Sequence, residues 1–183
     1  MGALKDPGQP AGTGWLKVRL DRVTPSDWRE LRSVRLRALA DAPTAFISEP
    51  DREADWQEDD WRSVIEQARW VVARTAHGVV GVARSKQDPE SPQRRFIEAV
   101  WVEPEFRRLG VGHRLVRWLI DSELRSGIKE ILLWVIVGNA HARSFYVSLG
   151  FRPTGRRQPV PGPENRTEEL LAYVIDRLGF RPG

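Results

Sequence analysis

Two glycines and two arginines share a short loop that is suited to binding an anion. The loop, Arg107 to Gly112, lies between a strongly apolar stretch and an amphipathic one. Gly110 and Gly112 let the backbone adopt positive φ angles and approach a ligand closely. The helix that we predict next would present unpaired N–H groups and the positive end of its dipole. With the charges of Arg107 and Arg108 nearby, the pattern predicts an anion site, and we expect a pyrophosphate there.

The same loop does not match either of the common nucleotide-binding motifs. The third glycine of the dinucleotide fingerprint is replaced by Leu115, and no acidic residue follows some 20 residues later at a strand end. A P-loop requires Gly-Lys before Ser or Thr, which the loop lacks. Because a lone Gly-x-Gly pair is often only a turn, the loop by itself leaves both a turn and an anion site open.

The elements around the loop alternate between strand and helix. Seven consecutive apolar residues at 131–137 indicate a central strand that is buried on both faces. Apolar residues at i, i+4 spacing predict an amphipathic helix over 112–126. We expect strands at 96–102, 131–137 and from Phe151, and helices at 112–126 and 139–149. The strands at 96–102 and 131–137 should be parallel, because a helix crosses over between them.

The remaining elements complete a mixed sheet in one domain. We predict strands at 15–23, 69–75, 78–86 and 169–175, helices at 25–40 and 59–67, and loops at 88–92 and 158–163. The fold class is therefore α/β (α+β), with six to seven strands and about four helices. We expect a flexible leader over 1–14, one domain over 15–177 and a tail over 178–183.

The composition excludes several classes of protein. The 183 residues are 40% hydrophobic and 30% charged, which is typical of a globular domain. No apolar run reaches 18 residues and the first 14 residues lack the apolar region of a secretory signal, so we expect a cytoplasmic protein with no membrane partner. The absence of cysteine excludes disulfides and a cysteine nucleophile, and three scattered histidines predict no metal site. The basic residues behind the net charge of +4 are dispersed, which makes nucleic acid an improbable partner and favours anionic small molecules.

Two segments resemble the motifs of one enzyme family. Residues 102–112, Val-Glu-Pro-Glu-Phe-Arg-Arg-Leu-Gly-Val-Gly, resemble motif A of the GNAT acetyltransferase superfamily, Arg/Gln-x-x-Gly-x-Gly/Ala after a strand that ends in Val-x-Pro. Residues 139–151 resemble its second motif, Asn-x-x-Ala-x-x-x-Tyr-x-x-x-Gly-Phe. The resemblance covers roughly 96–155, is looser at 35–46 and is weakest after Arg156. It implies a GNAT-like domain whose sheet splays between the strands at 96–102 and 131–137.

The resemblance also implies a reaction and a binding site. Its implied function is an N-acyltransferase that moves an acetyl group from acetyl-CoA to a primary amine, by direct transfer in a ternary complex. Backbone N–H groups of 108–113 would hold the pyrophosphate, and main-chain atoms of Val100 and Val102 would pair with the pantetheine arm. Asn139 would contact the pantetheine region at the mouth of the splay. The implied cofactor-binding residues are Val100, Trp101, Val102, Arg107, Arg108, Leu109, Gly110, Val111, Gly112, His113, Asn139 and Tyr146.

The resemblance implies Tyr146 as the general acid and Glu98 as the general base. Each residue also has a structural interpretation. Asn139 is an ordinary helix N-cap, and Tyr146 is a residue that would pack well on a helix. The neighbours of Glu98 are apolar, so an unpaired carboxylate there would be costly and its pKa would rise toward that of a base. A salt bridge with an arginine is the alternative for Glu98.

The acceptor is indicated only weakly. Seven acidic residues against one arginine at 49–60 could attract a cationic amine, or could form a solvated linker whose Asp59 and Asp60 favour the next helix. Small amines, amino acids and protein N-termini remain open, as does a homodimer. The rival functions are a non-catalytic acyl-CoA-binding module and, less favoured, a nucleic-acid-binding protein.

Overall fold

Seven strands form one sheet in the computed structural model, which describes residues 17–42, 53–160 and 165–174. The strand order is β1-β2-β3-β4-β5-β7-β6, and among these residues only β4 and β5 pair in parallel. The strands are β1 (Arg19–Arg22), β2 (Ala68–Thr75), β3 (Gly78–Asp88), β4 (Ser91–Val102), β5 (Glu130–Ile136), β6 (Arg152–Pro159) and β7 (Thr167–Val174). The helices are α1 (Trp28–Asp41), α3 (Glu58–Glu66), α4 (Val111–Arg125) and α5 (Ala140–Ser148), with short 3-10 turns at Pro25–Asp27 and Pro104–Phe106.

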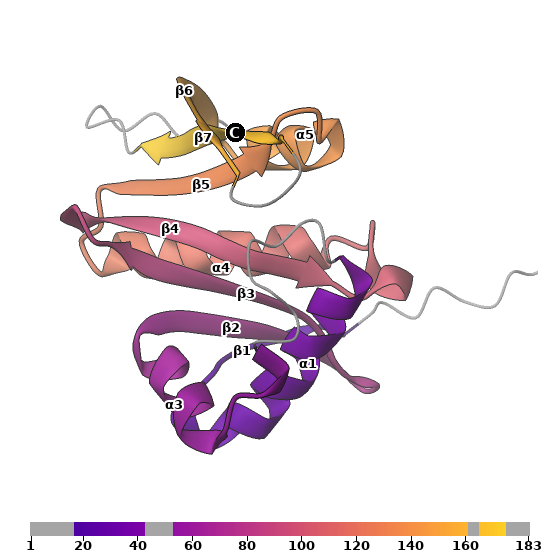
Figure 1. Ribbon diagram of the computed structural model, residues 1–183. Helices are drawn as coiled ribbons and strands as arrows, with labels where there is room; N and C mark the ends of the chain where they lie inside the picture. The colour runs from indigo at the N-terminus through magenta and orange to yellow at the C-terminus, as the bar shows by residue number, and fades with distance from the viewer. Residues whose placement is uncertain (1–16, 43–52, 161–164, 175–183) are drawn as a thin grey trace, which may run out of the picture.

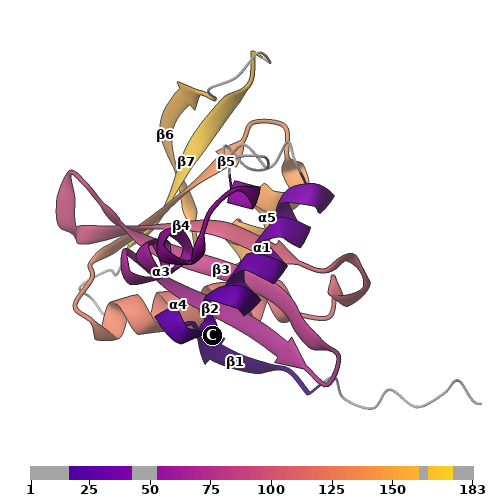
Figure 2. The same ribbon diagram turned by 60° about the horizontal axis from the view of Figure 1, so that its bottom comes forward.

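Helices cover both faces of this sheet, because alternate residues of its strands point to opposite sides. Val71 and Ala73 of β2 belong to the core beneath α4, whereas Val72 between them belongs to the core beneath α1 and α3. Figure 1 shows α4 behind β3 and β4 and shows α1 and α3 in front of β1 to β3. Figure 2 shows the same two layers from another side, with β6 and β7 extending beyond the helices.

The spacing of apolar residues explains how the helices pack against the sheet. Leu31, Val34 and Ala38 of α1 are three and four residues apart and are fully buried. In α4, Leu115 and Leu119 follow the same rule and are equally buried. None of the helices among the described residues is long and apolar enough to span a bilayer.

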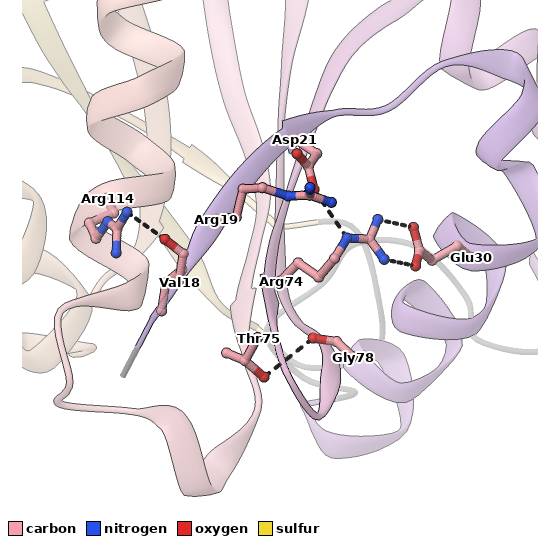
Figure 3. A network of polar contacts seen from close by, with 8 residues as sticks. All are labelled: Val18, Arg19, Asp21, Glu30, Arg74, Thr75, Gly78 and Arg114. Atoms are coloured by element: carbon pink, nitrogen blue, oxygen red, sulfur yellow. Dashed lines mark hydrogen bonds and ion pairs between the residues drawn. The ribbon is translucent and has the colours of Figure 1, made fainter. Parts of the chain in front are cut away.

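A polar network attaches the first strand to both layers (Figure 3). Arg74 of β2 donates to Asp21 of β1 at 3.0 Å and to Glu30 of α1 at 2.6 Å. Arg114, in the first turn of α4, donates to the carbonyl of Val18 at 2.7 Å. Arg74 of β2 therefore links β1 to α1, and Arg114 links α4 to the residue that precedes β1.

The predicted fold class is confirmed, with some boundaries corrected. The predicted loop at 88–92 is wrong: β3 and β4 continue to a tight turn at Pro89-Glu90, where the Asp88 carboxylate accepts from the Glu90 N–H at 2.8 Å. The predicted loop at 158–163 begins too early, since β6 continues to Pro159, and 161–164 lie outside the described residues. The first predicted strand begins at Arg19 rather than Trp15. The leader at 1–14 and the tail at 178–183 also lie outside the described residues.

Candidate active site

The site is organised by the point at which β4 and β5 separate. Their parallel pairing covers three positions and ends where Phe96 lies opposite Leu132. β4 then continues to Val102 and β5 to Ile136, with no further pairing between these described residues. Figure 1 shows the two strands diverging toward α5. The inner strand edges beyond the last pair are therefore open to a ligand that adds to them as an extra strand would.

A β-bulge in β4 lies inside this opening. Glu98 lies opposite Arg84, yet Trp101 lies opposite Val82, so β4 has one more residue than β3 between these two pairs. Ala99 accommodates the extra residue with a φ of 55°, in the left-handed region. The bulge changes which edge of β4 the backbone groups of its last residues face.

The orientation of the strand after the bulge can be derived from one hydrogen bond. The N–H of Glu103 donates to the carbonyl of Val80 on β3 at 2.9 Å. Because successive residues direct their backbone groups to opposite edges, Trp101 faces β3 like Glu103, and Val100 and Val102 face the opening. Trp101, which the resemblance implies as a cofactor-binding residue, has its backbone paired with β3 and its side chain buried beneath α1.

The loop after β4 presents a row of free backbone donors. The N–H of Arg107 donates to Pro104 at 3.2 Å, and the N–H of Arg114 donates to Gly110 at 3.1 Å. Between them, the six N–H groups of 108–113 have no acceptor among the described residues. The side chains of Leu109 and His113 are exposed, and Val111 is buried as the first residue of α4.

Backbone conformation makes this row a candidate anion site. Arg108 and Gly110 have φ angles of 61° and 79°, and alternation with left-handed residues turns neighbouring N–H groups toward one point. Because Gly110 needs this positive φ, glycine is favoured there, although an added Cβ would meet nothing within 4 Å. The start of α4 adds the positive end of its dipole. The donor set therefore fits a diphosphate such as that of acetyl-CoA.

Arg107 differs from the expectation that it adds free charge at the loop. Its Nε donates to the carbonyl of Val102 at 2.9 Å, and its Nη2 binds the Asp41 carboxylate at the end of α1. The same oxygen of Asp41 accepts from the indole Nε1 of Trp101 at 2.8 Å. The indole hydrogen bond, with a smaller contribution from Arg107, holds the pKa of Asp41 below its usual value. Asp41 therefore connects α1, β4 and the anion loop.

α5 brings Tyr146 next to this region. An added Cβ on Gly112 would lie 3.5 Å from the Phe145 ring and 3.6 Å from Val102, so α5 packs against the first turn of α4. Tyr146 is partly buried, with its ring centroid 4.9 Å from that of Phe145 and 5.9 Å from that of Phe151. Burial raises the pKa of the Tyr146 hydroxyl above its usual value. The hydroxyl is therefore protonated at neutral pH, and its raised pKa makes it a weaker acid than a solvent-exposed tyrosine.

Asn139 caps the same helix. Its Oδ1 accepts from the N–H of Ala142 at 3.0 Å, and the residue is exposed. The cap role that the sequence offered is therefore present, and it leaves the side-chain amide group open to solvent.

Glu98 has a fixed cation beside it. Its Oε2 accepts from Nε and Nη2 of Arg84 at 2.9 and 2.6 Å, and the guanidinium lies 5.1 Å from the centre of the Trp70 ring. The Glu98 side chain is 39% exposed. The expectation of a desolvated, unpaired carboxylate is thus wrong, and the salt-bridge alternative is present. Ile97 points to the opposite face, into the core beneath α4, whereas Phe96 shares the partly exposed face with Glu98.

Comparisons with known proteins identify the family. The family model described as "Acetyltransferase (GNAT) family" matches residues 28–151, which include the strand opening, the loop and α5. The chain belongs to this family.

Relatives and solved structures agree with this assignment. The [ribosomal protein bS18]-alanine N-acetyltransferase of Escherichia coli K12 is 35% identical over 71 residues, which are 38% of this chain and 48% of that protein, so the chain spans about half the length of this curated relative. The uncharacterized N-acetyltransferase YjhQ of the same organism is 27% identical over 86% of this chain and 82% of its own. YncA from Salmonella typhimurium, solved with its cofactor acetyl-CoA, shares the fold with a TM-score of 0.71 at 17% identity, covering 89% of this chain and 96% of that one.

The acidic segment of this GNAT domain has mainly structural roles. Glu53 is buried and makes two 2.8 Å hydrogen bonds with Arg35 of α1. Asp60 accepts from the N–H of Gln57 and caps α3, and Glu58 pairs with Arg62. Glu49 and Asp51 lie outside the described residues. The capping interpretation of the sequence therefore accounts for the described acids better than attraction of a cation does.

Sequence reasoning missed two residues of this GNAT site. From the sequence, Asp41 lies just after the predicted helix at 25–40 and Arg84 lies within the predicted strand at 78–86, and neither is predicted to act in the site. Both act across the sheet: Asp41 on a loop 66 residues away, and Arg84 on Glu98 through the β3–β4 pairing. No local pattern predicts either contact, because any of the 29 lysine and arginine residues of the chain could pair with these carboxylates.

Proposed function

We propose that this protein is an acetyl-CoA-dependent N-acetyltransferase that transfers the acetyl group directly to a primary amine in a ternary complex. The observation that carries the proposal is the uninterrupted row of six free N–H groups at 108–113, beside the open edge of β4. A turn that binds no ligand would leave fewer of these N–H groups unpaired, and water would accept their hydrogen bonds. Membership of the GNAT family and the acetyl-CoA-bound YncA structure support the same proposal.

Each group has a defined task in this proposal. Acetyl-CoA supplies an acetyl group activated as a thioester. The backbone N–H groups of 108–113 bind its diphosphate, and the main chains of Val100 and Val102 bind the arm along the β4 edge. Asn139 contributes its side-chain amide at the end of the opening. Tyr146 holds a proton at Oη for the departing sulfur, at a position that burial keeps protonated.

The thermal effect of CoA tests the anion site directly. A ligand that binds only the folded protein increases the free energy of unfolding by about 2.7 kcal/mol at a hundred times its Kd, and so raises the melting temperature. We expect CoA to raise the melting temperature of the wild type. Gly110→Asp should abolish this increase, because it places a negative charge where the diphosphate binds.

Gly110→Asn is the matched control. Asparagine has nearly the same size as aspartate and tolerates positive φ equally well, so both variants carry the same backbone strain. The neutral variant should keep most of the CoA-induced increase. An undiminished increase in Gly110→Asp would exclude the loop as the diphosphate site.

A further inference from the structure

We propose that the acceptor is a small amine that also carries a carboxylate and an apolar or aromatic body, as free amino acids do, and that it binds in a pocket beside the strand opening. This inference rests on the proposed function, because it concerns the second substrate of the same reaction. The pocket is about 210 Å³. It is lined by Lys86, Gln87, Pro89, Phe96, Glu98 and Trp134.

The strand register places this pocket where an acceptor must enter. Phe96 and Leu132 form the last parallel pair of β4 and β5. Glu98 and Trp134 are each two residues farther along, on the same face, so they are the first side chains on either side of the opening. The thioester would lie in the opening between β4 and β5. A molecule in this pocket would therefore approach it from the face of the sheet opposite α4.

No helix covers this part of the sheet among the described residues. α1 and α3 pack over β2 and β3, and the β5 side of the face is beyond them in Figures 1 and 2. Phe96 and Trp134 are only partly buried, against a small cluster of Leu132, Leu170 and Ala172. Two aromatic rings thus form an accessible apolar wall, which suits an apolar or aromatic body.

Two opposite charges stand at the ends of that wall. The Oε2 of Glu98 accepts from Arg84. Its Oε1 has no hydrogen bond among the described residues and can accept from an amine. Lys86 lies directly opposite Phe96 and is exposed, with no ion pair in the described part of the chain. Lys86 and Glu98 are therefore diagonal neighbours, about 7–8 Å apart at Cα. Because Arg84 already pairs with Glu98, Lys86 stays free for an anion.

The size of the pocket favours a small acceptor over a protein. Pockets for drug-sized ligands measure about 300–1,000 Å³, and this one is smaller. A peptide N-terminus has no carboxylate next to its amine, so it would leave Lys86 without a partner. A free amino acid satisfies both charges at once. Acetylation of a protein N-terminus is the alternative outcome of the test, and one relative is named as an N-acetyltransferase for an alanine of ribosomal protein bS18.

The test compares an amino acid with its amide, which lacks only the carboxylate, and with a peptide. L-phenylalanine, L-phenylalanine amide and a ten-residue peptide with an N-terminal alanine are assayed for CoA release at fixed acetyl-CoA. We expect kcat/KM for phenylalanine to exceed that of its amide by about tenfold, the usual size of one charge-assisted hydrogen bond. Lys86→Gln should remove this preference, and Lys86→Arg should keep it. Lys129→Gln, at an exposed lysine before β5, is the matched control and should change nothing.

A second measurement does not require turnover. Phenylalanine should raise the melting temperature of the CoA-bound wild type, and this increment should be lost in Lys86→Gln alone. Three results would overturn the inference while the proposed function stands. They are an equal kcat/KM for phenylalanine and its amide, a preference for phenylalanine that survives in Lys86→Gln, and acetylation of the peptide only. CoA binding with no acetylation of any acceptor would also overturn it. Loss of the CoA-induced stabilisation itself would instead refute the proposed function.

Discussion

Asp41 provides the sharpest test of how α1, β4 and the anion loop are joined. Replacing it with alanine removes the acceptor of the Trp101 indole N–H, which lies 2.8 Å away on a residue that is 5% exposed. A buried donor without a partner costs about 1–3 kcal/mol. The ion pair with Arg107 is half-exposed and adds about 0–1 kcal/mol.

Two effects oppose this loss. A carboxylate at the C-terminal end of a helix is unfavourable by about 0.3–1 kcal/mol, and Asp41 is the last residue of α1. Alanine also has the higher helix propensity, by up to about 0.7 kcal/mol. The unpaired indole N–H outweighs both effects, so we expect a net loss of about 1–2 kcal/mol. For a chain of this length, this loss corresponds to a melting temperature lower by about 2–8 °C.

Thermal melts of four variants separate the contributions. Asp41→Asn keeps an oxygen for the indole and should lose less than half as much stability as Asp41→Ala. Arg107→Ala removes only the exposed ion pair and should cost less than about 1 kcal/mol. Asp55→Ala, at an exposed side chain with no partner in the described residues, is the control and should change stability by under about 0.5 kcal/mol.

A double-mutant cycle with Trp101→Phe identifies the donor. Phenylalanine has no N–H, so adding Asp41→Ala to this background should cost clearly less than it does in the wild type. An equal cost in both backgrounds, or a cost for Asp41→Ala no larger than for Arg107→Ala, would refute the assignment of the stabilisation to the indole hydrogen bond.

Three further expectations follow from the site. Tyr146→Phe should lower turnover by about 10²–10⁴-fold with little change in CoA affinity, and steady-state rates within a few-fold of wild type would return Tyr146 to a packing role. Glu98→Gln should lower the melting temperature by about 0.4–4 °C, since it weakens a half-exposed pair with Arg84 worth about 0.2–1 kcal/mol; a higher melting temperature would mean that the carboxylate is not stabilised there. The pKa of Asp41 is lowered on folding, so its stabilisation is present above the unfolded value near 3.9 and is lost as pH falls below it. Melting temperatures from pH 6 to pH 2 should therefore fall less steeply for Asp41→Asn than for wild type, and parallel curves would contradict this.

Periodicity was sufficient to predict the elements that hold the candidate site. The seven apolar residues at 131–137 and the i, i+4 pattern at 112–126 specify β5 and α4, because burial determines both patterns. The first half of β4 could not be predicted in this way. Its residues, Ser-Pro-Gln-Arg-Arg, are polar, and pairing with β3 rather than side-chain burial keeps them extended.

The environment of Glu98 depends on information that no local pattern contains. The apolar neighbours of Glu98 predict burial only if the face on which it lies is covered. The described residues leave the Glu98 side chain 39% exposed, and the register of β3 and β4 places Arg84 opposite it. Likewise, the Arg-Arg pair before Gly110 predicts charge at the loop, but the direction of Arg107 is determined by a carboxylate at the end of a distant helix.

The two faces of the sheet suggest why a splay is required by the proposed reaction. Tyr146 packs with the core on the α4 side, whereas Glu98, Phe96 and Trp134 belong to the opposite face. In a continuous sheet the backbone ladder between β4 and β5 would separate them. Because that ladder ends at Phe96, an amine held on one face can reach a thioester in the opening, while a proton held by Tyr146 remains on the other side of it. Acceptor choice then depends on residues such as Lys86 that do not touch the donor, so it should be alterable there without loss of CoA binding.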